Sequence, residues 1–306
     1  MLNFSVYKNK RIKCAGLGEV LFDVYPTGPK IGGATANFAF HCRQNGIEAA
    51  VISSVGNDAL GFLSRDLLAK KFLPALLSVS DRPTGTVNVT LSDKGIPSYT
   101  FASDTAYDNI NVNDEMCAMV STLDMICFGT LAQRNQKSHK AIMRLLDMTK
   151  KDCLRVFDVN LRGDFYTKEI IEGSLQRSEI VKCNDDELPY LCSIAGIKEI
   201  NPDNYFEYLK SMDIFCFIYT EGAKQSTVYL NDQKSVQNTL KVETVDTVGA
   251  GDSFTATLVS QLMKGKDLKT AHVLAVKVAA FVCTKKGAMP EIPYSMFEWY
   301  SNSWYL

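Results

Sequence analysis

Short apolar runs alternate along the chain with longer segments whose apolar residues recur at helical spacing. This alternation is typical of a mostly parallel sheet with helices on both faces. The predicted strands cover residues 12–18, 49–55, 125–128, 154–159, 180–183, 214–219 and 227–230. The predicted helices cover residues 35–44, 138–148 and 186–194. Asn45-Gly46 is typical of a helix end, and Asn201-Pro202 of a helix start.

One stretch departs from this alternation. Residues 86–91 alternate with period two, 92–95 have the composition of a turn, and 98–101 are extended again, so a hairpin without a helix is predicted. Together with residues 21–25 it could form a small extra sheet, which would serve as a lid, a dimer contact or an ordinary edge hairpin. Because we find no linker or repeat, we expect one domain over residues 1–306, with a lid from about 20–27 and 84–103.

Composition narrows the class of protein. The chain has 306 residues, of which 46% are hydrophobic and 22% charged, as in ordinary globular proteins. Its 33 basic and 34 acidic residues give a net charge of -1, so we expect no nucleic-acid partner and no membrane surface. No apolar stretch approaches membrane-spanning length, which predicts a cytoplasmic protein. The nine cysteines lack C-x-x-C spacing and predict free thiols, and no zinc cluster can be found.

The segment D-T-V-G-A-G-D-S-F at 246–254 carries the most chemistry. We predict a strand over 234–245 before it and a helix over 253–263 after it. Gly249-Ala250-Gly251 would then be a tight turn whose free N–H groups, with the helix dipole, favour an anion. Asp252 could accept the proton of a hydroxyl that attacks phosphorus. The alternative is a glycine turn whose aspartate only caps its helix.

Familiar nucleotide motifs are missing. The phosphate loop G-x-x-x-x-G-K-[ST] does not occur, and the glycines at 249 and 251 do not fit G-x-G-x-x-G because Phe254 holds the last position. A second glycine-rich segment, at 32–37, also opens a predicted helix and places Asn37 at its start. Asp23 follows the first strand and could bind sugar hydroxyls, or could simply face solvent.

Taken in order, these segments resemble the ribokinase-like, or PfkB, family of carbohydrate kinases. The resemblance covers nearly the whole chain and lies at 18–23, 32–37, V-G-x-D-x-x-G at 55–61, P-T-G at 83–85, D-x-N-x-R at 158–162, N-x-x-E at 184–187, T-x-G at 220–222, D-T-x-G-A-G-D at 246–252 and G-A-M-P at 287–290. It implies an α/β fold of three layers, with a mostly parallel central sheet and a small β-sheet lid.

The resemblance also implies roles for the matching residues. Asp252 resembles the catalytic base, and the amides of Gly249, Ala250 and Gly251 resemble the anion hole for the γ-phosphate of ATP. The other implied roles concern binding. They assign the sugar to Asp23, Gly33, Asn37 and Arg162, phosphate and hydrated Mg²⁺ to Asn184 and Glu187, and the nucleotide to Thr220 and Gly222.

Three positions depart from the family pattern. Gln225 replaces the second glycine of T-L-G-x-x-G, which affects the nucleotide loop. Val248 stands where a second threonine is common in the family, at a position associated with a monovalent-cation site. Whether the protein depends on K⁺ therefore stays open. Residues 101–104 lack the arginine that several family members carry after the lid strand, so a contact to a sugar phosphate or sugar acid is not supported.

The acceptor follows from finer resemblances. Gly18-Glu19 and the segment 83–85 look more like fructokinases than ribokinases, and no Arg/Lys cluster lies beside 32–37. A neutral hexose, fructose first, is therefore expected. The alternatives are 2-keto-3-deoxygluconate, ribose, a nucleoside, a non-catalytic sugar or nucleotide sensor, and a structural protein. A homodimer through the lid is implied by the resemblance and supported only by the hairpin.

Overall fold

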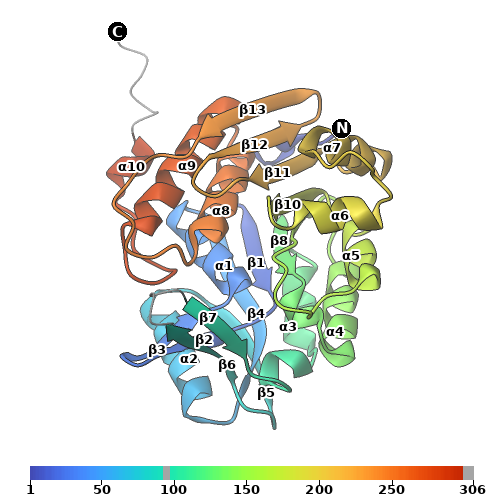
Figure 1. Cartoon of the computed structure of the whole chain (residues 1–306). Helices are drawn as coiled ribbons and strands as arrows, with labels where there is room; N and C mark the ends of the chain where they lie inside the picture. The colour runs from blue at the N-terminus through green and yellow to red at the C-terminus, as the bar shows by residue number, and fades with distance from the viewer. Residues whose placement is uncertain (92–96, 299–306) are drawn as a thin grey trace.

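The computed structural model describes residues 1–91 and 97–298. Its large sheet, sheet A, has the strand order β13-β12-β11-β10-β9-β8-β1-β4-β5 (Figure 1). Its strands are β1 (Lys13–Leu17), β4 (Glu48–Gly56), β5 (Ala75–Ser80), β8 (Met125–Gly129), β9 (Leu154–Asp158), β10 (Ile180–Asn184), β11 (Cys216–Thr220), β12 (Gln225–Leu230) and β13 (Gln233–Asn238). The pairs from β5 to β11 are parallel, and β12 and β13 are antiparallel.

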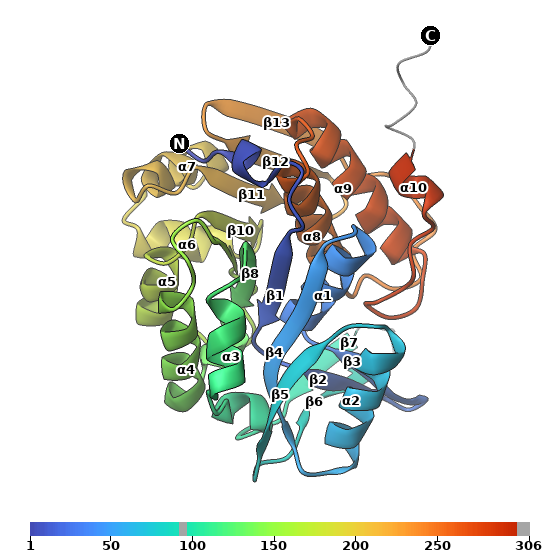
Figure 2. The same cartoon turned by 180° about the vertical axis from the view of Figure 1, so that it is seen from behind.

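Helices cover both faces of sheet A, as Figures 1 and 2 show. The core on one face contains residues of α1 (Ala34–Gln44), α2 (Ala59–Lys70), α8 (Ala250–Met263) and α9 (Leu268–Cys283). The core on the other face contains residues of α3 (Asp114–Val120), α4 (Gln136–Asp147), α5 (Lys168–Leu175), α6 (Leu188–Ile194) and α7 (Pro202–Ser211). Successive strand residues alternate between the two cores, as Cys14 and Ala15 do in β1. The result is an α/β fold of three layers with a mostly parallel central sheet, as expected from the resemblance.

A second sheet, sheet B, lies at the end of the molecule away from α7 and β13 (Figure 1). It has four strands in the order β3-β2-β6-β7. These are β2 (Leu21–Tyr25), β3 (Gly28–Gly32), β6 (Gly85–Leu91) and β7 (Pro97–Phe101). The predicted small extra sheet is therefore confirmed, with β3 as an additional strand. The turn predicted at 92–95 lies outside the described residues.

The predicted strands of sheet A and helices α1, α4, α6 and α8 are present with small shifts at their ends. The strand predicted over 234–245 is wrong beyond Asn238, because β13 ends there. Its apolar side chains do not cover a core: Leu240 is 46% exposed and Val245 is 53% exposed. Alternating apolar and polar residues stabilise a strand only when the apolar side chains are buried against a neighbouring layer. The chain instead forms an irregular connection to α8.

The cysteines are all free, as predicted. Across 1–91 and 97–298, no helix is long and apolar enough to cross a bilayer. The same residues contain no group of three or more His, Cys, Asp or Glu side chains arranged to hold a metal ion.

Candidate active site

A cavity of about 970 Å³ opens at the carboxyl ends of the parallel strands, between sheet A, sheet B and the start of α8. This is where open α/β sheets usually bind ligands. Eleven of the twelve site residues predicted from sequence line it, and Glu187 is the exception. Those eleven are Asp23, Gly33, Asn37, Arg162, Asn184, Thr220, Gly222, Gly249, Ala250, Gly251 and Asp252.

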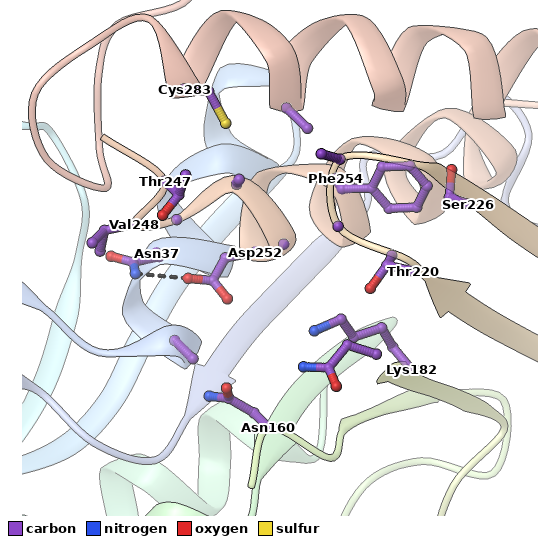
Figure 3. Close-up of a pocket in the computed structure, with 18 of the residues that line it drawn as sticks. Asn37, Asn160, Lys182, Thr220, Ser226, Thr247, Val248, Asp252, Phe254 and Cys283 are labelled. Carbon is purple, nitrogen blue, oxygen red and sulfur yellow. Dashed lines mark hydrogen bonds between the residues drawn. The ribbon is translucent and has the colours of Figure 1, made fainter. Parts of the chain in front are cut away.

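The side chains of Asp252 and Asn37, which both line the cavity, meet there (Figure 3). The Asn37 side-chain amide donates to Asp252 Oδ2 at 2.7 Å, across 215 residues of sequence. Asn37 lies in the first turns of α1 and Asp252 in the first turn of α8, and these two helices pack together. The hydrogen bond fixes the carboxylate so that its other oxygen is available to a ligand.

The surroundings of Asp252 favour its protonated form. Burial, and then repulsion from Asp158, raise the pKa of Asp252 to about 6, although Asn37, Lys182 and Arg162 act in the opposite direction. A carboxylate with a pKa near 6 is still ionised at neutral pH and is a stronger base than an ordinary aspartate. It is therefore suited to accept a proton.

The glycine turn before Asp252 requires its glycine. Gly249 has φ +80°, and a Cβ there would lie 2.6 Å from the Ala288 carbonyl oxygen. The helix begins at Ala250, three residues earlier than predicted, and the Ala250 amide donates to the Thr247 carbonyl at 3.2 Å. The amides of Gly251 and Asp252 lie in the first turn, where a helix offers N–H groups without helical partners. The N-terminus of α8 can therefore receive an anion.

Asp246 holds the turn against the C-terminal loop. Its two oxygens accept from the amides of Val248, at 3.1 Å, and Gly287, at 2.9 Å. Val248 thus contributes its backbone to this contact, and its side chain is not required for it. Asp246 thus links the signature segment at 246–252 to the G-A-M-P segment at 287–290.

The part of the cavity beside β2 and the start of α1 is acidic, and we call it the acceptor side because the sugar is expected there from the sequence. Burial, and then Asp246, raise the pKa of Asp23 to about 6. Glu19, which follows β1 and is 2% exposed, accepts the Ala34 amide at 2.9 Å, and burial raises its pKa to about 7. Gly33 packs so closely on Glu19 that a Cβ would lie 2.2 Å from the Glu19 carbonyl oxygen. Glu19 therefore fixes the turn that opens α1.

Lys182 is a site residue that sequence reasoning missed. It points into the cavity from β10 (Figure 3) and donates to Asp158 at 3.0 Å, with both side chains less than a tenth exposed. Burial alone would lower the pKa of Lys182, but Asp158 and Glu187 raise it above its usual value, so the ammonium stays charged. Its Nζ would lie 3.4 Å from a Cβ on Gly251. The sequence did contain one sign of this role, because Lys182 is a charged residue within the apolar strand β10.

Asn184 and Glu187 form a reciprocal cap at the end of β10. The backbone N–H of Glu187 donates to Asn184 Oδ1, and the backbone N–H of Asn184 donates to Glu187 Oε2, both at 2.9 Å. Glu187 Oε1 accepts the Leu161 amide, also at 2.9 Å. Glu187 is 3% exposed, links β10 to the loop after β9 and does not line the cavity.

The far end of the cavity is lined by Thr220, Gly222 and an apolar wall. Gly222 adopts φ +50°, and Gln225 begins β12 beside it. The Gln225 side chain donates to Glu221 Oε2 at 2.5 Å, so the departure from the glycine pattern adds a hydrogen bond to this loop. The wall includes Phe254, Val276, Ala279, Ala280 and Cys283.

The chain is similar in sequence to sugar kinases along most of its length. A putative sugar kinase of Pyrococcus horikoshii is 30% identical, covering 88% of this chain and 84% of the relative. An ATP-dependent 6-phosphofructokinase of Thermoanaerobacterium thermosaccharolyticum is 29% identical, covering 96% and 95%. A probable fructokinase of Arabidopsis thaliana is 25% identical, covering 90% and 91%.

Solved structures give the same fold. A fructokinase of Xylella fastidiosa with bound ATP has a TM-score of 0.82 and 18% identity, covering 95% of this chain and 99% of that one. The Pyrococcus horikoshii sugar kinase in complex with ATP has a TM-score of 0.74 and 26% identity, covering 91% and 94%. The family model described as pfkB family carbohydrate kinase matches residues 24–294. The chain therefore belongs to the PfkB family of carbohydrate kinases.

Proposed function

We propose that this carbohydrate kinase transfers the γ-phosphate of ATP to a primary hydroxyl of a neutral hexose, with fructose as the first choice. One observation carries the proposal. Asp252, hydrogen-bonded to Asn37 at 2.7 Å, stands in the first turn of α8 and lines the same cavity as the acidic acceptor side. A base, an anion site and a set of hydroxyl-binding groups are thereby adjacent.

In the proposed mechanism, Asp23, Gly33 and Asn37 orient the sugar. Asp252 accepts the proton of the primary hydroxyl as its oxygen attacks the γ-phosphorus in line and the bond to the ADP oxygen breaks. The amides at the start of α8 stabilise the charge on the phosphoryl oxygens. Lys182, charged and close to Gly251, adds to that stabilisation.

Magnesium enters only as the partner of ATP. Mg²⁺ commonly keeps several waters and binds through phosphates with few protein carboxylates. Because both Glu187 oxygens accept backbone amides, we propose that Glu187 orients Asn184 and the loop after β9, and that it reaches the hydrated ion only through water. When bound, the ion would neutralise phosphate charge.

We also propose that sheet B, over about 20–27 and 84–103, closes on the sugar as a lid. Its residues Leu21, Asp23, Val87 and Phe101 line the cavity. Closure would exclude water and limit wasteful hydrolysis of ATP. Pairing of two lids in a homodimer is a further part of the proposal, to be tested by sedimentation.

Fructose 6-phosphate is the second candidate acceptor. It is favoured by the 29% identical 6-phosphofructokinase and by Arg162, an exposed cation that lines the cavity. The three carboxylates of Glu19, Asp23 and Asp252 on the acceptor side argue for a neutral sugar, because they would repel a second phosphate.

A panel of acceptors tests the proposal. Fructose, fructose 6-phosphate, 2-keto-3-deoxygluconate, ribose and adenosine are each assayed with ATP and Mg²⁺, in K⁺ and in Na⁺ buffer, by coupled ADP release. We expect the highest kcat/KM for fructose. Turnover of another acceptor without fructose would reject the sugar, and no transfer to any acceptor would favour a sensor.

A further inference from the structure

The lid strand β7 ends beside an arginine from elsewhere in the chain. Arg134 follows the short helix η3 (Leu131–Gln133), which lies after β8. Its Nη2 donates at 2.5 Å to the carbonyl of Ala102, the residue directly after β7. Residues 101–104 contain no arginine. The cation beside this part of the lid is Arg134, which lies 32 residues after Ala102 in the sequence.

The Arg134 guanidinium is held in one orientation. Its Nε and Nη2 donate to the two oxygens of Asp108, both at 2.7 Å. It also lies between two rings, 4.9 Å from the centroid of Tyr107 and 4.7 Å from that of Phe165. The side chain is 8% exposed and that of Asp108 1%. A forked, stacked contact of this kind is specific to arginine, because an ammonium group has neither its planarity nor its paired donors.

Phe165 connects this guanidinium to the acceptor side. Its amide donates to the Arg162 carbonyl at 3.1 Å and closes the turn that carries Arg162. Its ring packs edge-to-face on Phe101, the last residue of β7, at 5.8 Å. Phe101 and Arg162 both line the cavity, and Arg134 does not.

We propose that Arg134 is a positioning residue for the acceptor site. It contacts the end of β7 through Ala102 and the Arg162 turn through Phe165, and thereby holds Phe101 and Arg162 at a fixed separation. The proposal rests on the proposed sugar kinase function and adds to it a residue outside every matched family motif. Because Arg134 acts on one half of the cavity, its loss should weaken sugar binding and leave nucleotide binding intact.

Kinetics of two variants test this. R134K keeps the charge and loses the fork, and the double variant D108N/R134M removes both charges so that neither is left buried alone. For both we expect the acceptor KM to rise about tenfold or more and the ATP KM to change by less than about twofold. ATP hydrolysis without sugar should rise relative to transfer. R155K is the control, because Arg155 makes the same forked contact with Glu179 outside the cavity lining, at a more exposed site.

A measurement without substrate separates the two proposals. Hydrogen exchange of the backbone amides at 99–105 and 160–166 should be faster in R134K than in the wild type and unchanged in R155K. Unchanged exchange, or an equal rise of both KM values, would reject the positioning role. If no acceptor is found for the wild type, the proposed function fails while the exchange data still decide the role of Arg134.

Discussion

At the scale of residues, the site depends on carboxylates kept in surroundings that disfavour their charge. Asp252, Glu19 and Asp23 each have a raised pKa, with burial as the largest cause. Groups with perturbed pKa values gather at functional sites because catalysis needs them, and their charge then reduces stability. Each of the first two carboxylates leads to a prediction.

Asp252→Asn should retain ATP binding and lose most turnover. Asparagine keeps the size of the side chain and its contact with Asn37 but cannot accept the proton, and general-base catalysis is typically worth about 10²–10⁴-fold. Steady-state kcat and calorimetric ATP binding measure the two effects. D232N, at an exposed aspartate outside the cavity lining, is the control. A kcat near that of the wild type would remove Asp252 from the mechanism.

Glu19→Gln should make the apo protein more stable at pH 8 and have little effect at pH 4. The folded-state pKa of Glu19 is about 7, above its usual value of 4.5, so the stability lost through Glu19 is negligible below that usual value and grows as pH rises from there through 7. Glutamine can still accept the Ala34 amide and does not ionise. The gain at pH 8 should be at most about 3 kcal/mol, from one pKa unit being about 1.4 kcal/mol. Urea unfolding at both pH values measures it, and equal stability at pH 8 would contradict the burial of an ionised Glu19.

At the scale of elements, the chemistry lies where strands and turns lead into helices. The turn before α8 depends on one backbone conformation, because Gly249 has φ +80° and no room for a Cβ beside Ala288. The start of α1 depends on a glycine in the same way, because Gly33 packs against Glu19 in the loop after β1 with no room for a Cβ.

Gly249→Ala should lower both stability and kcat. The added methyl would lie 2.6 Å from the Ala288 carbonyl oxygen in a conformation that alanine rarely adopts, so the first turn of α8 must shift away from the phosphate position. Thermal unfolding and steady-state kinetics test this. Gly173→Ala in α5, where a Cβ meets nothing within 4 Å, should instead be neutral or stabilise by up to about 1 kcal/mol. Equal behaviour of the two variants would contradict the role of the turn.

The sequence predicted elements well where a buried face produced the pattern. The strands of sheet A from β12 across to β4 are short apolar runs because both of their faces are covered, and α1, α4 and α6 carry end signals or helical spacing. The edge strand β5 is less buried and was not predicted. The strand expected beyond Asn238 failed because its alternating side chains are exposed. β3 was missed because its residues, G-P-K-I-G, have little strand preference and are placed by pairing with β2.

The residues of the candidate site also divide into those that a local sequence pattern predicts and those that tertiary packing determines. Residues within contiguous motifs, such as Asp252 and Asn37, were predicted, although their mutual hydrogen bond was not, since nothing local links positions 215 apart. Lys182 and Arg134 were missed because their partners, Asp158 and Asp108, are set by tertiary packing. Glu187 was predicted as a magnesium residue, yet its contacts are to backbone amides, which sequence spacing cannot distinguish.

At the scale of the whole molecule, sheet A and sheet B enclose the cavity between them, so ligands should bind mainly to the folded state. ATP at a hundredfold its Kd should stabilise the protein by roughly 2.7 kcal/mol, which raises the melting temperature by several degrees. Differential scanning fluorimetry with ATP, with GTP and with the sugar measures this, and D252N should show the ATP shift undiminished. No shift with ATP would contradict a nucleotide site.

The contact between Asn37 and Asp252 also has a consequence for biosynthesis. Asn37 leaves the ribosome early, whereas α8 and its carboxylate emerge only after four-fifths or so of the polypeptide has been made. A nascent chain thus acquires the proposed general base only after the lid strands and Asn37 have been made. In the proposed mechanism, phosphoryl transfer would require that α8 has docked on α1, so incomplete polypeptides would not transfer phosphate.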